Sequence, residues 1–147
     1  VTCKRMIHFM GKQELFKNKL VGAFFRAMGG FAVERGSGGG EAIENAIQLV
    51  KDGNVMCIFP EGTRSRDGKP MRAKSGVAVI ASGTGEMVLP VAIYREGKIR
   101  PFCRATIRYG IPINASETKM QDGSRGELKR ISGLIMDRIV ELWKKGF

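Results

Sequence analysis

The sequence predicts an α/β fold, with a mixed and largely parallel sheet flanked by helices. Short apolar segments alternate with segments of helical periodicity, an order typical of βαβ units. Glycine-containing breaks separate them at Gly29-Gly30, at residues 36–40 and at Asp52-Gly53. At 147 residues and without internal repeats, the chain is long enough for one core, and we expect a single domain over residues 1–147.

The first half of the chain predicts three strands and two helices. The strands are expected at residues 6–10, 31–33 and 54–59, and the helices at 13–28 and 42–50. The first helix carries an apolar face of Leu15, Phe16, Leu20, Val21, Phe24, Phe25 and Met28. We favour packing of this face into the core, with contact to lipid as the alternative.

The second half predicts two more strands and two helices. They are expected as a short helix over 75–82, a strand over 87–93, a strand through Arg108 and a helix over 124–145. Ser124 and Glu127 have the spacing of a capping box at the start of the last helix. Its apolar face consists of Leu128, Ile131, Ile135, Ile139 and Leu142.

The chain is strongly basic, with 25 basic and 14 acidic residues and a net charge of +11. This charge predicts attraction to anionic lipid, phosphorylated substrates or nucleic acid. We disfavour nucleic acid because aromatic residues are not interleaved with a basic face and no known module is present. The three cysteines lack the spacing of a zinc site or disulfide framework, and we expect Cys57 to be buried in its strand and no metal or cofactor to be needed.

The segment Phe59-Pro60-Glu61-Gly62-Thr63-Arg64-Ser65 is the most informative part of the sequence. It follows an apolar strand, where α/β sheets usually bind ligands. Glycine allows close approach of the backbone, the hydroxyls and N–H groups can donate hydrogen bonds, and arginine suits phosphate. Basic residues continue beyond it: Arg64, Arg66, Lys69, Arg72 and Lys74. The loop therefore predicts a phosphate-ester site.

These seven residues resemble the third signature block of the 1-acylglycerol-3-phosphate acyltransferases. Three further segments resemble blocks of the same family in the same order. They are Ile7-His8-Phe9-Met10-Gly11-Lys12, Gly30-Phe31-Ala32-Val33-Glu34-Arg35 and Val88-Leu89-Pro90-Val91-Ala92-Ile93. The resemblance covers about residues 4–110 and implies the family's α/β fold.

The resemblance implies that Arg64, Arg35 and Lys12 converge on the phosphate of the acceptor lipid. Surface solvation is the alternative for Arg35 and Lys12. Other residues of the loop are expected to shape it or to bind the acceptor: Glu61, Gly62, Thr63 and Ser65. Gly62 is expected to supply a backbone conformation that strains other residues. Lys74 matches a family pattern, but a solvated lysine is the simpler interpretation.

The family's catalytic pair, His-x-x-x-x-Asp, is not found in this sequence. His8 is the only histidine, and Gln13 rather than aspartate stands five residues after it. His8 also lies inside the strand that should follow the catalytic block, so we assign no catalytic residue. Because the chain begins at Val1 rather than Met, we expect its N-terminal segment to be missing.

The resemblance implies acyl transfer from acyl-CoA or acyl carrier protein to the sn-2 hydroxyl of lysophosphatidic acid, giving phosphatidic acid. We expect this fragment to be inactive without the upstream pair, and the alternative is a non-catalytic module that binds anionic lipid or phosphate. The expected partners are the acyl donor, the lysophospholipid acceptor and an anionic membrane surface. The expected location is the cytoplasmic face of a membrane, held peripherally or anchored through the upstream segment.

Overall fold

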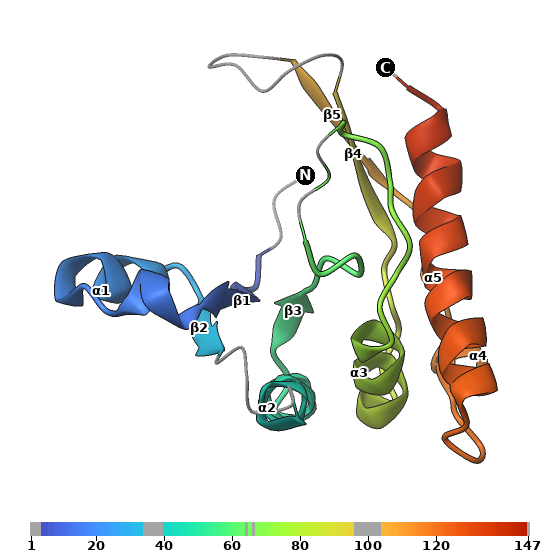
Figure 1. Cartoon of the computed structure of the whole chain (residues 1–147), viewed down its shortest axis with the longest axis horizontal. Coiled ribbons are helices and arrows are strands. Elements are labelled where there is room, and N and C mark those ends of the chain that lie inside the picture. Colours follow the sequence, from blue (N-terminus) through green and yellow to red (C-terminus); the bar gives the residue numbers. More distant parts are fainter. Residues whose placement is uncertain (1–3, 34–39, 64, 66, 96–103, 147) are drawn as a thin grey trace. The chain divides into compact units, whose positions relative to one another are not determined.

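The computed structural model describes residues 4–33, 40–63, 65, 67–95 and 104–146 (Figure 1). The chain forms two compact units, Val1–Ile58 and Phe59–Phe147. The α/β class is confirmed, because a parallel sheet flanked by helices is present. The strands divide into a three-stranded parallel sheet in the first unit and an antiparallel pair in the second.

The sheet of the first unit has β1 (Ile7–Lys12) between β2 (Gly30–Val33) and β3 (Val55–Cys57). Both neighbours run parallel to β1, so the carboxyl ends of all three strands lie along one edge. Helix α2 (Gly40–Lys51) connects β2 to β3 and packs on β3. Gly53, at φ +83°, follows this helix and permits the turn into β3.

The single helix expected over residues 13–28 is wrong. The structure has a 3₁₀ helix, η1 (Gln13–Phe16), followed by α1 (Lys19–Ala27). Asn18 causes the break, because its side-chain oxygen accepts hydrogen bonds from the N–H groups of Leu20 at 3.0 Å and Val21 at 3.3 Å. It is therefore the N-cap of α1, a role that asparagine fills well.

The second unit contains three helices and one antiparallel strand pair among its described residues. The elements are α3 (Gly76–Thr84), β4 (Val91–Arg95), β5 (Ala105–Tyr109), α4 (Ala115–Thr118) and α5 (Arg125–Lys144). The short helix α4 was not expected from the sequence. Ser124 caps α5 as expected, but the Glu127 carboxylate accepts from the N–H groups of residues 121–123 rather than from Ser124.

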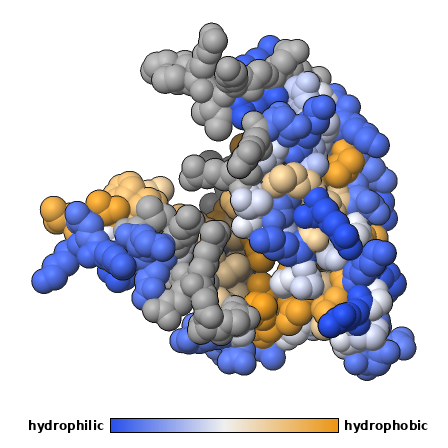
Figure 2. All heavy atoms as spheres, viewed as in Figure 1, coloured by the Kyte–Doolittle hydropathy of each residue, from blue (hydrophilic) through white to orange (hydrophobic). Residues whose placement is uncertain are grey.

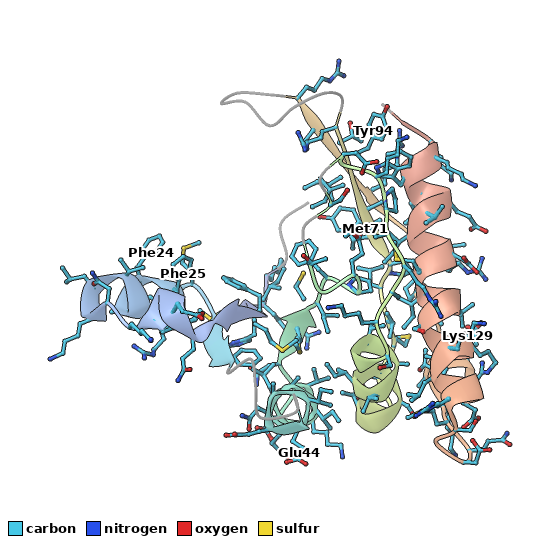
Figure 3. All side chains as sticks on the ribbon, viewed as in Figure 1. Phe24, Phe25, Glu44, Met71, Tyr94 and Lys129 are labelled. Carbon is cyan, nitrogen blue, oxygen red and sulfur yellow. The ribbon has the colours of Figure 1, made fainter. Side chains whose placement is uncertain are left out.

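The core of the second unit lies where α5 packs against α3 and β4. Ile131 and Ile135 of α5 are completely or almost completely buried, as the apolar periodicity predicts. Tyr94 of β4 contacts Trp143 of α5, with ring centroids 5.4 Å apart (Figure 3). From α3 the buried residues are Val77, Ala78, Ile80 and Ala81, so this short helix is a rigid support for the segment that precedes it.

Candidate functional site

Residues 59–74, here called the signature loop, form a loop that is closed by its own backbone. The N–H of Gly62 donates to the carbonyl of Phe59 at 3.0 Å, which makes a tight turn at the start. The N–H of Lys74 donates to the carbonyl of Pro60 at 2.9 Å, which joins the end of the loop to its beginning. Helix α3 begins two residues after Lys74. The loop is therefore held at both ends, as a binding loop on a rigid support should be.

Gly62 has φ +65°, a conformation that L side chains rarely adopt, as the sequence analysis expected. The side chain of Lys74 lies beside it. A Cβ atom at position 62 would stand 2.9 Å from Lys74 Cδ and 3.2 Å from Lys74 Nζ. The amino group is thus close to the turn that contains Glu61, Gly62 and Thr63. Lys74 is also exposed, as the interpretation of a solvated lysine expects, so it is a solvated cation beside this turn.

Asp67 organises the middle of the signature loop. One of its carboxylate oxygens accepts from the hydroxyl of Ser65 at 2.9 Å and from the N–H of Lys69 at 3.1 Å. The hydrogen bond from Lys69, and then the one from Ser65, holds the pKa of Asp67 below its ordinary value of 3.8. Ser65 therefore uses its proton to stabilise the loop, and its hydroxyl oxygen can still accept a hydrogen bond.

Cations dominate the surroundings of the signature loop. Lys69, Arg72 and Lys74 are exposed on it. Arg95 of β4 also approaches, with Nη2 3.7 Å from the position of a Cβ atom on Gly68. The carboxylates of the loop are those of Glu61 and Asp67, and the second is engaged internally. This balance favours an anionic ligand such as a phosphate ester.

The structure describes four of the seven predicted substrate-binding residues together on the signature loop. Glu61 and Ser65 are half-buried, whereas Gly62 and Thr63 are exposed. Among the described residues nothing donates a hydrogen bond to the Glu61 carboxylate, so no bond of this side chain is seen to shape the loop. Arg64 and Arg35 lie outside the described residues.

Lys12 is described by its backbone. It ends β1 and pairs with Val33, the last residue of β2. Arg35 follows Val33 by two residues in the sequence. Lys12 thus lies at the carboxyl end of β1, while the convergence of Lys12 and Arg35 on a phosphate stays a prediction.

Neither His8 nor Cys57 has the environment of a catalytic group. His8 lies within β1, in register with Met56, and no described carboxylate bonds to it. Cys57 is exposed, so its expected burial is wrong, yet partial desolvation of the sulfur raises the pKa of the thiol and disfavours the thiolate. Within the described ranges, no cluster of histidine, cysteine and carboxylate side chains could hold a metal ion.

Comparison with known proteins identifies the family of this chain. The Acyltransferase family profile matches residues 1–94, a range that contains the parallel sheet and the whole signature loop. The chain therefore belongs to the Acyltransferase family. More narrowly, it is a homologue of the 1-acyl-sn-glycerol-3-phosphate acyltransferases.

Three relatives define this similarity. The 1-acyl-sn-glycerol-3-phosphate acyltransferase of Bacillus subtilis strain 168 is 34% identical over 64% of this chain and 51% of its own. That of Streptococcus pneumoniae is 31% identical over 80% of this chain and 45% of its own. The crystal structure of PlsC, the 1-acyl-sn-glycerophosphate acyltransferase from Thermotoga maritima, matches with a TM-score of 0.68 at 28% identity. That match covers 97% of this chain and 58% of the Thermotoga chain.

The hydrogen bonds to Asp67 predict that the loop loses stability in acid, when this carboxylate is protonated. Because its pKa is lowered in the folded chain, the stabilisation is present above pH 3.8 and is lost as the pH falls through the lower, folded value. We expect the Lys69 amide resonance to titrate with a midpoint below 3.8. Asp67→Asn should abolish this titration, and a midpoint at or above 3.8 would contradict the geometry.

Proposed function

We propose that the protein to which this chain belongs transfers a fatty acyl group to the sn-2 hydroxyl of lysophosphatidic acid, giving phosphatidic acid. The donor is acyl-CoA or acyl carrier protein. The observation that carries this proposal is the closed, cation-rich signature loop with the Phe-Pro-Glu-Gly-Thr-Arg-Ser sequence. The chain spans about half the length of the bacterial relatives that it matches, so activity is proposed for the whole protein.

In this proposal the signature loop binds the phosphate of the acceptor. Arg64 is the principal ligand because its guanidinium presents two parallel N–H donors to phosphate oxygens. Thr63 supplies a hydroxyl, and Lys74, close to Gly62, supplies a second positive charge. Lys12 and Arg35, from the strand ends of the first unit, are proposed to contribute further charge.

The chemical step needs a base that this chain does not supply. The acceptor hydroxyl loses its proton as its oxygen attacks the thioester carbonyl, an ester bond forms, and the thiolate of the donor leaves and takes a proton. The resemblance assigns the proton transfer to a His-x-x-x-x-Asp block upstream of β1. His8 is not that base, since it lies in the middle of a strand pairing. The described chain thus orients the acceptor, and the upstream block activates it.

The test is acyl transfer by the full-length gene product, followed with labelled acyl-CoA and lysophosphatidic acid. We expect phosphatidic acid from the wild type. We expect Arg64→Ala to lower kcat/KM for lysophosphatidic acid by about ten- to a hundredfold, because charge-assisted hydrogen bonds contribute about 1.5–3 kcal/mol. Arg125→Ala, which removes an exposed cation at the start of α5, is the matched control and should change little.

The outcomes of this assay distinguish an acyltransferase from a non-catalytic lipid-binding module. Unchanged kinetics in Arg64→Ala would overturn its role in phosphate binding. Binding of lysophosphatidic acid by the wild-type product without any turnover would instead support a non-catalytic lipid-binding module. Lysophosphatidic acid neither bound nor acylated would overturn both functions.

Gly62→Ala tests the geometry of the signature loop. Alanine at φ +65° costs about 1–3 kcal/mol of strain, and its Cβ would displace Lys74. We expect kcat/KM for lysophosphatidic acid to fall about tenfold or more. Gly85→Ala is the matched control: Gly85 has φ +67° at the end of α3, with no atom within 4 Å of an added Cβ. If both variants lose the same activity, general destabilisation rather than the loop explains the effect.

A further inference from the structure

Large apolar side chains are exposed in both units. Those on α1 are 41–84% exposed at Leu20, Val21, Phe24 and Met28, so the favoured packing of these four residues into the core is wrong. In Figure 2 hydrophobic spheres gather along one side of α1 and hydrophilic ones along the other. In the second unit Phe59 is 67% exposed. It differs from the residues of α1 because it belongs to the signature loop.

Phe59 is held at the first position of the turn that begins the signature loop. The strand β3 ends two residues before Phe59, earlier than the strand expected over 54–59, so Phe59 lies outside the sheet. Its carbonyl accepts from the N–H of Gly62 at 3.0 Å. The carbonyl of the next residue, Pro60, accepts from the N–H of Lys74 at 2.9 Å. Two hydrogen bonds therefore fix the backbone that carries this exposed aromatic ring.

The position of Phe59, rather than its exposure alone, indicates a ligand. Single exposed apolar side chains are ordinary on protein surfaces. Phe59, however, begins a turn whose fourth residue, Gly62, lies beside the amino group of Lys74. The first and fourth Cα atoms of such a turn lie within about 7 Å of each other. An apolar ring and the proposed phosphate site thus stand close together, as do the phosphate and the acyl chain of lysophosphatidic acid, which only the glycerol backbone separates.

We propose that Phe59 contacts the glycerol carbons and the first methylene groups of the acceptor's acyl chain, and so makes the signature loop select lysophosphatidic acid over glycerol 3-phosphate. This inference rests on the proposed function, in which the same loop binds the acceptor phosphate. The cations of the loop bind a group that both molecules carry. Burial of methylene groups against the ring of Phe59 favours only the acylated molecule, because glycerol 3-phosphate has no chain to remove from water.

Ligand binding to the full-length gene product, without acyl donor, tests this selectivity. Dissociation constants are measured by titration calorimetry for glycerol 3-phosphate and for hexanoyl lysophosphatidic acid, whose short chain keeps it monomeric. We expect Phe59→Ala to weaken binding of the hexanoyl lipid about tenfold and to leave that of glycerol 3-phosphate unchanged. Phe59→Leu keeps an apolar side chain and should retain most of the preference.

Two further variants serve as controls. Ile111→Ala removes a side chain that is 87% exposed outside the signature loop, and it should change neither dissociation constant. Arg64→Ala should weaken both ligands by the same factor, because both carry the phosphate. Since any residue at position 59 keeps the carbonyl that accepts from Gly62, an unchanged affinity for glycerol 3-phosphate also reports that the turn is intact.

The outcomes separate this inference from the proposed function. If the wild type binds both ligands equally, or if Phe59→Ala weakens both equally or neither, Phe59 does not select the acceptor, while phosphate binding by the loop still stands. Binding of neither ligand to the wild type would overturn this inference and the proposed function together.

Phe59→Trp locates the acyl chain directly. Bound lysophosphatidic acid with a short brominated chain should quench the fluorescence of this variant more than that of the parent, whose one tryptophan is Trp143. An excess of glycerol 3-phosphate should reverse the additional quenching. Equal quenching of the variant and the parent by the bound ligand would show that the chain lies elsewhere, and would overturn the inference.

Discussion

The hydrogen bond from the N–H of Lys74 to the carbonyl of Pro60 is the constraint on which the candidate site depends. It closes a loop of otherwise irregular backbone and places the start of the family signature beside the residue that leads into α3. Since α3 is packed into the core of the second unit, it gives the end of the loop a rigid support. The bond also brings the Lys74 side chain to Gly62, where a larger residue would collide with it. Phosphate recognition would then cost little reordering of the loop.

In the proposed function, acceptor binding and proton transfer belong to different parts of the protein. The signature loop supplies cations and small residues, which suit a phosphate, whereas His8 lies within a strand pairing and no described carboxylate bonds to it. Positively charged side chains without a general base would hold the acceptor but would not activate its hydroxyl.

Local signals predicted the strands, the long helix and the signature loop, because these depend on periodicity and on a few residues with special backbone needs. Gly62 at φ +65° and Ser124 as an N-cap are examples. The break before α1 was also locally encoded by Asn18, but the apolar pattern on both sides concealed it. Nonlocal features were missed. The place of Lys74 requires closure of the loop, and an amphipathic pattern cannot distinguish a helix whose apolar face is buried from one whose apolar face is exposed.

The most direct test of the account is a titration of the isotope-labelled chain with lysophosphatidic acid, below its micelle-forming concentration, followed by backbone amide chemical shifts. The account predicts that the largest changes occur at Gly62, Thr63, Ser65 and Lys74. Glycerol 3-phosphate should shift the same amides, because it carries the same phosphate. Changes confined to α1, or no change within the signature loop at saturating ligand, would contradict the claim that this loop binds the acceptor.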